Sequence, residues 1–121
     1  MANEITLSHS MQVSNGQYKH QYLPDQRSIT QTNPGYIDMI VSIGTTEETL
    51  SFGDLGTVGI VTITNLDATN YVELGFSTGV YGDKLTAAKY VPHTYERNGS
   101  ATFYLKANTA TCKVHVIAYE A

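Results

Sequence analysis

The chain has 121 residues, which fits one domain with a core of its own and leaves little room for a second domain. The formal charge of −4 and the pI near 5.4, with seven basic residues scattered along the chain, argue against nucleic acid as the main partner, because phosphate binding needs clustered Lys and Arg. The single cysteine excludes an internal disulfide, and no apolar stretch approaches the roughly 20 residues that span a bilayer.

The N-terminal part of the chain predicts short strands joined by turns. Apolar residues of one parity predict a strand over residues 4–13. The following Asn15-Gly16 is the strongest two-residue hairpin signal, because both central positions of a type I′ turn need positive φ. Residues 18–22 alternate on the return strand, and a further short run covers residues 27–32.

The middle of the chain contains the clearest strands. In "YIDMIVSIG", residues 36–44, apolar and polar side chains alternate, and a brief strand is predicted at residues 50–52. Residues 57–64 are apolar on both faces, which predicts a strand that is covered on both sides. Residues 72–76 alternate again and predict a half-buried strand.

The last third begins with a less regular region. Its "DKLTAAKY", residues 83–90, is the best helical candidate, with one or two turns at most. Asn98-Gly99 predicts another hairpin turn, which leads into a strand over residues 100–107. Residues 108–110 then turn the chain into a final strand that ends near residue 119.

The spacing of these elements indicates the fold. About eight to ten short strands with regular turn signals are typical of an antiparallel β-sandwich, here jelly-roll-like, and a single all-β domain is expected over residues 1–121. The residues predicted to form its core are Ile37, Met39, Val41, Ile43, Val72, Leu74, Phe76, Phe103, Leu105, Val114 and Val116.

The polar loop in "TITNLDATNYVELG", residues 62–75, is the first candidate site. Asn65, Asp67, Thr69 and Asn70 supply oxygens at the close spacing of a calcium loop, but they include only one carboxylate. Asx and Thr side chains also bond their own backbone in turns, and that role accounts for every residue. We therefore expect a structural hairpin turn without a metal.

Catalytic chemistry finds no support in the sequence. The four histidines lie far apart and lack the short spacings of zinc ligands. Cys112 shares a strand face with aliphatic residues, which is typical of a small core residue, and Glu47-Glu48 lacks a partner carboxylate placed for glycoside hydrolysis. No nucleophile motif is present. The sequence predicts no enzyme, no cofactor and no metal.

The tyrosines are the more informative set. Most of the nine fall on strand faces opposite the aliphatic residues, where tyrosine serves protein interfaces, ordinary sheet surfaces or sugar stacking. A protein interface ranks first, because charged residues make up only 15% of the chain and no Trp is available for stacking. The candidate interface residues are Tyr18, Tyr22, Tyr71, Val61, Ile63, Tyr104, Ile117 and Tyr119.

The stretches "TITNLDATNYVELG" and "FYLKANTATCKVHVIAYE" together resemble small β-sandwich proteins encoded among the virion-structure genes of tailed bacteriophages. The corresponding elements here are residues 65–75 and 105–117, and the resemblance covers roughly residues 36–121. The region "AAKYVPHTYERNG" departs from the pattern. The resemblance implies no catalytic residue.

What the resemblance implies is a capsid decoration protein or another minor virion component. Its partners would be the phage major capsid protein or other virion proteins, with no nucleic acid and no membrane. The N-terminus lacks a secretory signal, so we expect a soluble protein made in the bacterial host cytoplasm and assembled into the virion. A closed homo-oligomer, with a trimer favoured, is also expected. The rival hypothesis is a carbohydrate-binding module of a phage tail or receptor-binding device.

Overall fold

The computed structural model describes residues 3–121, which form strands and turns only. Within these residues no helix is long and apolar enough to cross a membrane. The chain divides into two compact units, one up to Asn33 and one from Pro34 onward. A single sandwich over residues 1–121 was expected, whereas the sandwich comprises only the second unit.

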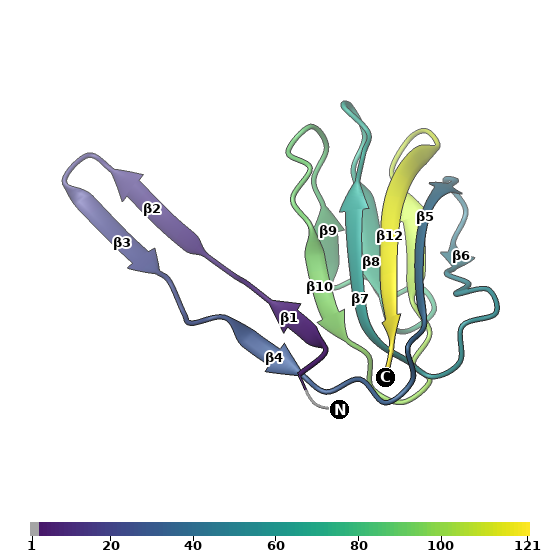
Figure 1. Ribbon diagram of the computed structural model, residues 1–121. Helices are drawn as coiled ribbons and strands as arrows, with labels where there is room; N and C mark the ends of the chain where they lie inside the picture. Colours follow the sequence, from purple (N-terminus) through teal and green to yellow (C-terminus); the bar gives the residue numbers. More distant parts are fainter. Residues whose placement is uncertain (1–2) are drawn as a thin grey trace. The chain divides into compact units, whose positions relative to one another are not determined.

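The first unit is a narrow antiparallel ribbon, visible in Figure 1 as β1 to β4. Its lower part pairs β1 (Ile5–Leu7) with β4 (Arg27–Ile29), and its upper part pairs β2 (Met11–Asn15) with β3 (Tyr18–Tyr22). Residues 4–13 thus contribute to two short strands instead of one long strand. We call residues 5–29 the ribbon.

The turn of the ribbon differs by one residue from the sequence prediction. Asn15 is paired with Tyr18, so the two turn residues are Gly16 and Gln17. Gly16 has a φ of +60°. Positive φ with glycine at the first central position is the requirement of a type II′ turn, which suits the twist of a hairpin as well as the expected type I′ turn does.

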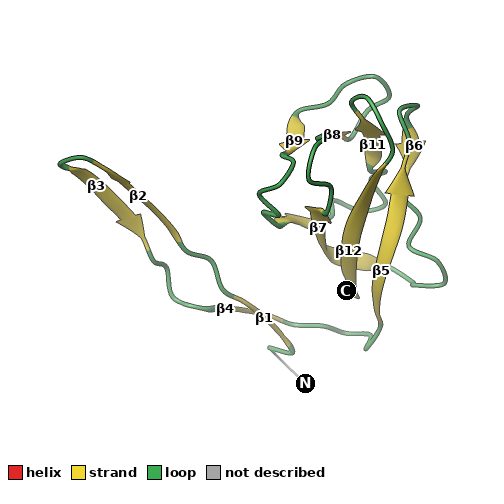
Figure 2. Ribbon diagram, turned by 90° about the horizontal axis from the view of Figure 1, so that it is seen from above, coloured by secondary structure: helices red, strands yellow, loops and turns green. Residues whose placement is uncertain are grey.

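The second unit is a sandwich of two four-stranded antiparallel sheets, which Figure 2 shows from above as two layers. The long sheet has the order β10-β7-β12-β5 and the short sheet has the order β6-β11-β8-β9. The strands are β5 (Tyr36–Ile43), β6 (Glu48–Thr49), β7 (Val58–Asn65), β8 (Val72–Gly75), β9 (Asp83–Leu85), β10 (His93–Glu96), β11 (Tyr104–Ala107) and β12 (Cys112–Glu120).

Strand pairing in the sandwich is nested along the chain. The hairpin β8–β9 lies at the centre, and β7 pairs with β10, β6 with β11 and β5 with β12 around it. Two turns that were predicted to be hairpins therefore connect different sheets: residues 66–71 lead from β7 to β8, and residues 97–103 lead from β10 to β11. Local turn residues reverse the chain, but they do not choose the pairing partner.

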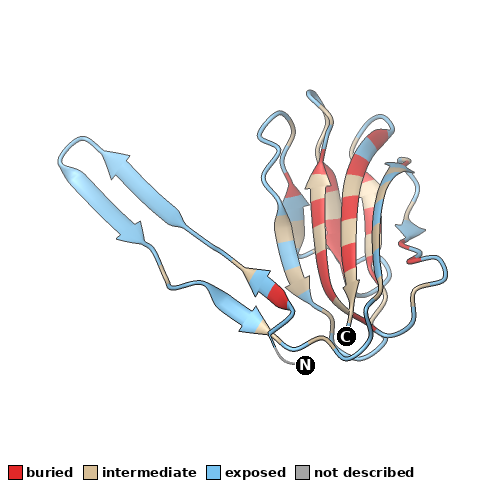
Figure 3. Ribbon diagram, viewed as in Figure 1, coloured by how far each residue is buried: buried red, intermediate tan, exposed pale blue. Residues whose placement is uncertain are grey.

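The core lies between the two sheets and follows the predicted alternation closely. Figure 3 shows buried bands alternating along β7 and β12. Of the predicted core residues, those that are buried are Ile43, Val72, Leu74, Phe103, Leu105, Val114 and Val116.

The remaining predicted core residues lie near the margins. Ile37, Met39 and Val41 are partly buried and pack against the core. They belong to β5, an edge strand, and β6 at the edge of the short sheet has only two residues. The prediction for Phe76 was wrong, since this side chain is 50% exposed at the end of β8.

Residues 57–64 are apolar at both parities for two reasons. Ile60 stands opposite Tyr119 on the outer side of the long sheet and is only 5% exposed, so β7 is covered on that side as well as on the core side, as the sequence predicted. A bulge accounts for the other apolar residues. Tyr119 faces Ile60, but the next residue of β12 faces Val58, so Gly59 is extra and the parity changes there. Val58, Val61 and Ile63 consequently all belong to the core. Val61 and Ile63, two candidate interface residues, are 0% exposed, and the interface prediction for them was wrong.

Two other local predictions also change. Residues 83–90 contain no helical turn: β9 occupies their start, and Ala88 and Tyr90 have φ values of 62° and 52° in the left-handed region. The brief strand expected at residues 50–52 lies earlier, at β6, although Leu50 and Phe52 are both buried.

Candidate interaction surfaces

The polar loop after β7 is held together by its own side chains. Asn65 is 1% exposed, and its Nδ2 donates to the carbonyl oxygens of Asn70 at 2.9 Å and Leu85 at 3.0 Å. Its Oδ1 accepts the backbone N–H of Asp67 at 2.9 Å. Because Leu85 ends β9 and Asn65 ends β7, this one side chain connects the two sheets.

Asp67 closes the same loop in a different way. Its carboxylate accepts the backbone N–H groups of Asn70 at 2.6 Å and Thr69 at 3.0 Å, and these bonds lower its pKa. Asn70 in turn accepts the hydroxyl of Thr109 at 2.6 Å. The loop oxygens thus bond protein donors, as expected for a structural loop. Within residues 3–121, no three His, Cys, Asp or Glu side chains come together as a metal site would require.

The environment of Cys112, the only thiol of the chain, is that of a core residue. Cys112 is buried in the core, and burial raises the pKa of its thiol, with a smaller contribution from the charge of Asp67. Its Sγ lies 3.6 Å from the carbonyl oxygen of Asn70 and 3.5 Å from that of Ala110. A raised pKa disfavours the reactive thiolate, which agrees with the role of a small core residue.

Glu47 anchors the loop between β8 and β9. Its carboxylate accepts the Tyr81 hydroxyl at 2.6 Å and the backbone N–H of Gly79 at 2.8 Å. These bonds lower the pKa of Glu47 and raise the pKa of Tyr81 to about 12. The same loop returns so closely over Gly75 that a Cβ there would lie 1.8 Å from the carbonyl oxygen of Val80. Both contacts shape the loop.

The candidate interface residues do not form one surface. Tyr18 and Tyr22 lie on the ribbon and are 66% and 49% exposed. Tyr71 and Tyr104 belong to the part of the sandwich near the short sheet, where the Lys84 ammonium lies 4.3 Å from the centre of the Tyr71 ring. The remaining two exposed candidates, Ile117 and Tyr119, lie on the outer face of the long sheet.

The outer face of the long sheet carries an apolar patch. Tyr36 stands directly opposite Tyr119, while Ile40 occupies the same face of β5. Tyr36 and Ile40 are 70% and 64% exposed, and Ile117 and Tyr119 are partly exposed. We call these four residues the outer patch. Tyr36 and Ile40 share the parity of Asp38 and so were recognisable in the sequence, but the predicted interface residues include neither of them.

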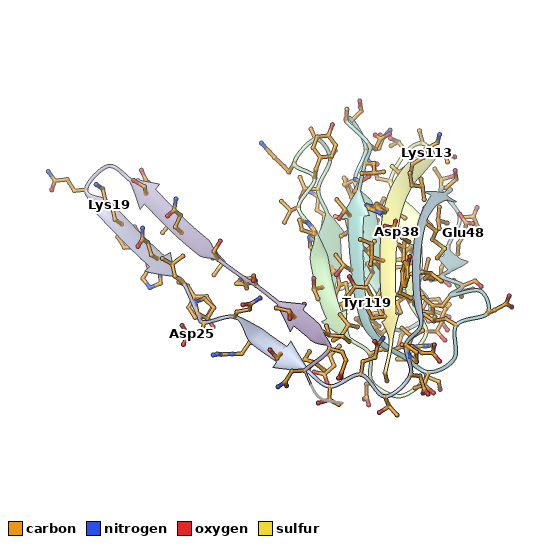
Figure 4. All side chains as sticks on the ribbon, viewed as in Figure 1. Lys19, Asp25, Asp38, Glu48, Lys113 and Tyr119 are labelled. Atoms are coloured by element: carbon orange, nitrogen blue, oxygen red, sulfur yellow. The ribbon has the colours of Figure 1, made fainter. Side chains whose placement is uncertain are left out.

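A single ion pair lies beside the outer patch. His115 Nε2 is 2.6 Å from Asp38 Oδ1, and their side chains are 36% and 55% exposed. Figure 4 shows Asp38 beside β12 with Lys113 and Tyr119 toward opposite ends of that strand. The imidazole thus gives Asp38, the one acid in β5, a hydrogen-bonding partner. The outer patch is therefore apolar, and the Asp38 carboxylate beside it is bonded to His115.

A second feature lies at one end of the sandwich, around Phe76. The Phe76 ring packs edge-on against the rings of Phe103 at 5.0 Å and Tyr95 at 5.8 Å. The Tyr95 hydroxyl donates to Asp83 Oδ2 at 2.5 Å. Two hollows adjoin Phe76. The first, of about 350 Å³, is lined by residues 74–77, Val80, Gly82 and Asp83. The second, of about 300 Å³, is lined by residues 96–98, Ala101 and Phe103.

Comparisons with protein families, curated proteins and solved structures find no match to this chain.

Proposed function

We propose that the protein is a non-enzymatic virion structural protein of a tailed bacteriophage, most specifically a capsid decoration protein that docks on the capsid lattice. The observation that carries this proposal is the outer patch. Tyr36 and Ile40 are large, mostly exposed apolar side chains on a regular sheet face. Exposed apolar surface of this kind marks partner contacts in soluble proteins.

The character of the outer patch favours a protein partner. Tyrosine and isoleucine pack against apolar protein surface, and tyrosine is enriched in interface cores. Clustered cations, which nucleic acid or an anionic membrane would require, are missing from the four patch residues. Self-association into a closed homo-oligomer is one use of such a surface, and the sequence resemblance favours a trimer.

The strand order supports the same class of protein. Nested pairing of eight strands in two four-stranded sheets agrees with a jelly-roll sandwich, a fold found in viral capsid and lectin domains. Fold class alone does not assign a function. It adds to the proposal because a regular sheet face holds the four residues of the outer patch side by side.

Ile117→Lys tests the outer patch. A lysine at this partly exposed position should weaken self-association, measured by sedimentation, and binding to capsid particles assembled without the protein, while the β-sheet circular dichroism persists. Ser42→Lys is the matched control, because it adds the same charge to the outer face near Lys113, at the other end of β5 from Tyr36. A wild-type protein that stays monomeric at high concentration and ignores the particles would contradict the proposal. Mass spectrometry of purified virions, with copy number, tests the virion location directly.

A carbohydrate-binding module is the second candidate, favoured by the hollows around Phe76. The half-exposed Phe76 ring offers a surface on which a sugar could stack. Asp83 in one hollow, and Arg97 and Asn98 in the other, offer hydrogen bonds to its hydroxyl groups. A glycan array with the wild-type protein and Phe76→Ala separates the two functions. Sugar binding that Phe76→Ala abolishes, together with no binding to particles, would favour this second candidate.

A further inference from the structure

The ribbon has one apolar and one polar face. Cross-strand partners share a face of a hairpin, and the pairs Met11–Tyr22, Val13–His20 and Asn15–Tyr18 lie on one side. The opposite side carries the pairs Gln12–Gln21 and Ser14–Lys19, with Gln21 Nε2 donating to Gln12 Oε1 at 3.2 Å. Apolar and aromatic side chains predominate on the first side, with Asn15 at its end beside the turn. We call the face formed by Met11, Val13, Asn15, Tyr18, His20 and Tyr22 the apolar ribbon face.

Every residue from 11 to 22 is exposed, as Figure 3 shows for β2 and β3. On the apolar ribbon face, Met11 is 60% exposed and Val13 is 44% exposed, beside the two tyrosines described above. A two-stranded hairpin with no third strand and no covering element is marginally stable in water. The first unit contains one buried apolar side chain, Ile5, among its described residues. The upper ribbon therefore lacks a core of its own.

From these observations we propose that the apolar ribbon face docks on an uncharged, apolar surface of a lattice subunit and becomes ordered there. This inference rests on the proposed function and deepens it, because it names a second docking element separate from the outer patch. The chemistry of the partner follows from the face itself. None of its residues is Lys, Arg, Asp or Glu, whereas Lys19 lies on the opposite face. An apolar protein surface complements such a face, and a phosphate backbone does not.

Size decides between a lattice subunit and a second copy of the ribbon. With tyrosines of about 150–250 Å² at half to two-thirds exposure, the apolar ribbon face offers on the order of 400 Å². Two such faces packed on each other would bury about 800 Å² in total, which is below the ~1,200–2,000 Å² of stable specific interfaces. A larger subunit surface can also contact the free edges of β2 and β3, which pair only with each other among the described strands. The lattice subunit is therefore the occupant to which the proposal commits.

The experiment uses the full-length protein and capsid particles assembled without it. Val13→Lys places a charge in the apolar ribbon face, and Val13→Thr keeps the β-branched shape that favours pairing while adding a hydroxyl. Gln12→Lys is the matched control, because it adds the same charge one residue away on the polar face. Val13→Lys should weaken binding to the particles by at least about tenfold and Val13→Thr by less, with Gln12→Lys near wild type. Amides of residues 11–22 should exchange fast in the free protein and become protected on the particles.

Each other outcome overturns the proposal in a recognisable way. Equal binding by wild type, Val13→Lys and Val13→Thr would remove the ribbon from the docking interface but leave the proposed function standing. Loss of a sedimenting oligomer in Val13→Lys, without particles present, would show that a second copy covers this face. Failure of the wild-type protein to bind the particles would remove the proposed function and this inference together. Persistent sandwich circular dichroism in all variants guards against a folding defect.

Discussion

Replacing Asn65 by alanine should destabilise the sandwich more than any change at another polar residue of the loop after β7. The side chain is 1% exposed and makes three hydrogen bonds, two as donor and one as acceptor. Asn65→Ala leaves the carbonyl oxygens of Leu85 and Asn70 and the N–H of Asp67 without that partner. At about 1 kcal/mol for each bond, the free energy of unfolding should fall by about 3 kcal/mol. The sandwich spans residues 34–121, and a domain of that size loses roughly 4–8 °C of Tm per kcal/mol, so the Tm should fall by about 12–24 °C.

Urea and thermal unfolding followed by circular dichroism measure this change. The urea midpoint should fall with an unchanged slope, because the variant alters stability and not the surface exposed on unfolding. Thr64→Ala is the control, since Thr64 precedes Asn65 but lies on the other face of β7, and its cost should stay below about 1 kcal/mol. Asn65→Asp supplies a second test: a carboxylate would face two carbonyl oxygens, so its destabilisation should grow as pH rises.

The result that would refute this reasoning is a loss below about 1 kcal/mol for Asn65→Ala, no larger than the loss in the control. It would mean that water replaces the three partners and that the loop does not connect the sheets. A large rise in Tm on adding calcium to the wild-type protein would show instead that the loop is a metal site. Calcium would then bind the native state through oxygens that we assign to hydrogen bonds.

Three further results should follow from the same structure. Phe103→Ala should lower the free energy of unfolding by about 3–5 kcal/mol in urea, because Phe103 is 1% exposed and contacts three aromatic rings; a cost below about 1 kcal/mol would place the core elsewhere. The folded protein lowers the pKa of Asp67, so this carboxylate stabilises the fold above its unfolded pKa near 4, and the stabilisation is lost as pH falls through the lower folded pKa. Asp67→Asn should therefore have a lower Tm than wild type at pH 7 and the same Tm in strong acid, as thermal unfolding at both pH values would show. In a spectrophotometric titration, Tyr81 and Tyr95 should ionise last of the nine tyrosines, Tyr81 near pH 12, and an early phase for both would contradict their bonds to Glu47 and Asp83.

Alternation and turn composition in the sequence determined much of this protein. The all-β sandwich, the inward side of β8, β11 and β12, and the structural role of the loop at Asn65 all follow from residue order, because side chains alternate along any strand and Asx side chains bond nearby backbone. The sequence also held the signal for the outer patch, since Tyr36 and Ile40 share a parity with polar residues.

Tertiary structure decided what no local pattern contains. The turns at Asn65–Asn70 and Asn98-Gly99 cross between sheets because strand pairing depends on residues distant in sequence, and turn composition is the same for a crossover and a hairpin. The bulge at Gly59 changes the parity of β7, so Val58 faces the core together with Val61 and Ile63, two residues that the sequence had suggested for an interface. Phe76 has the inward parity of β8, yet it follows the last residue of that strand and is 50% exposed. Burial depends on how much packs against a side chain as well as on the direction in which it points.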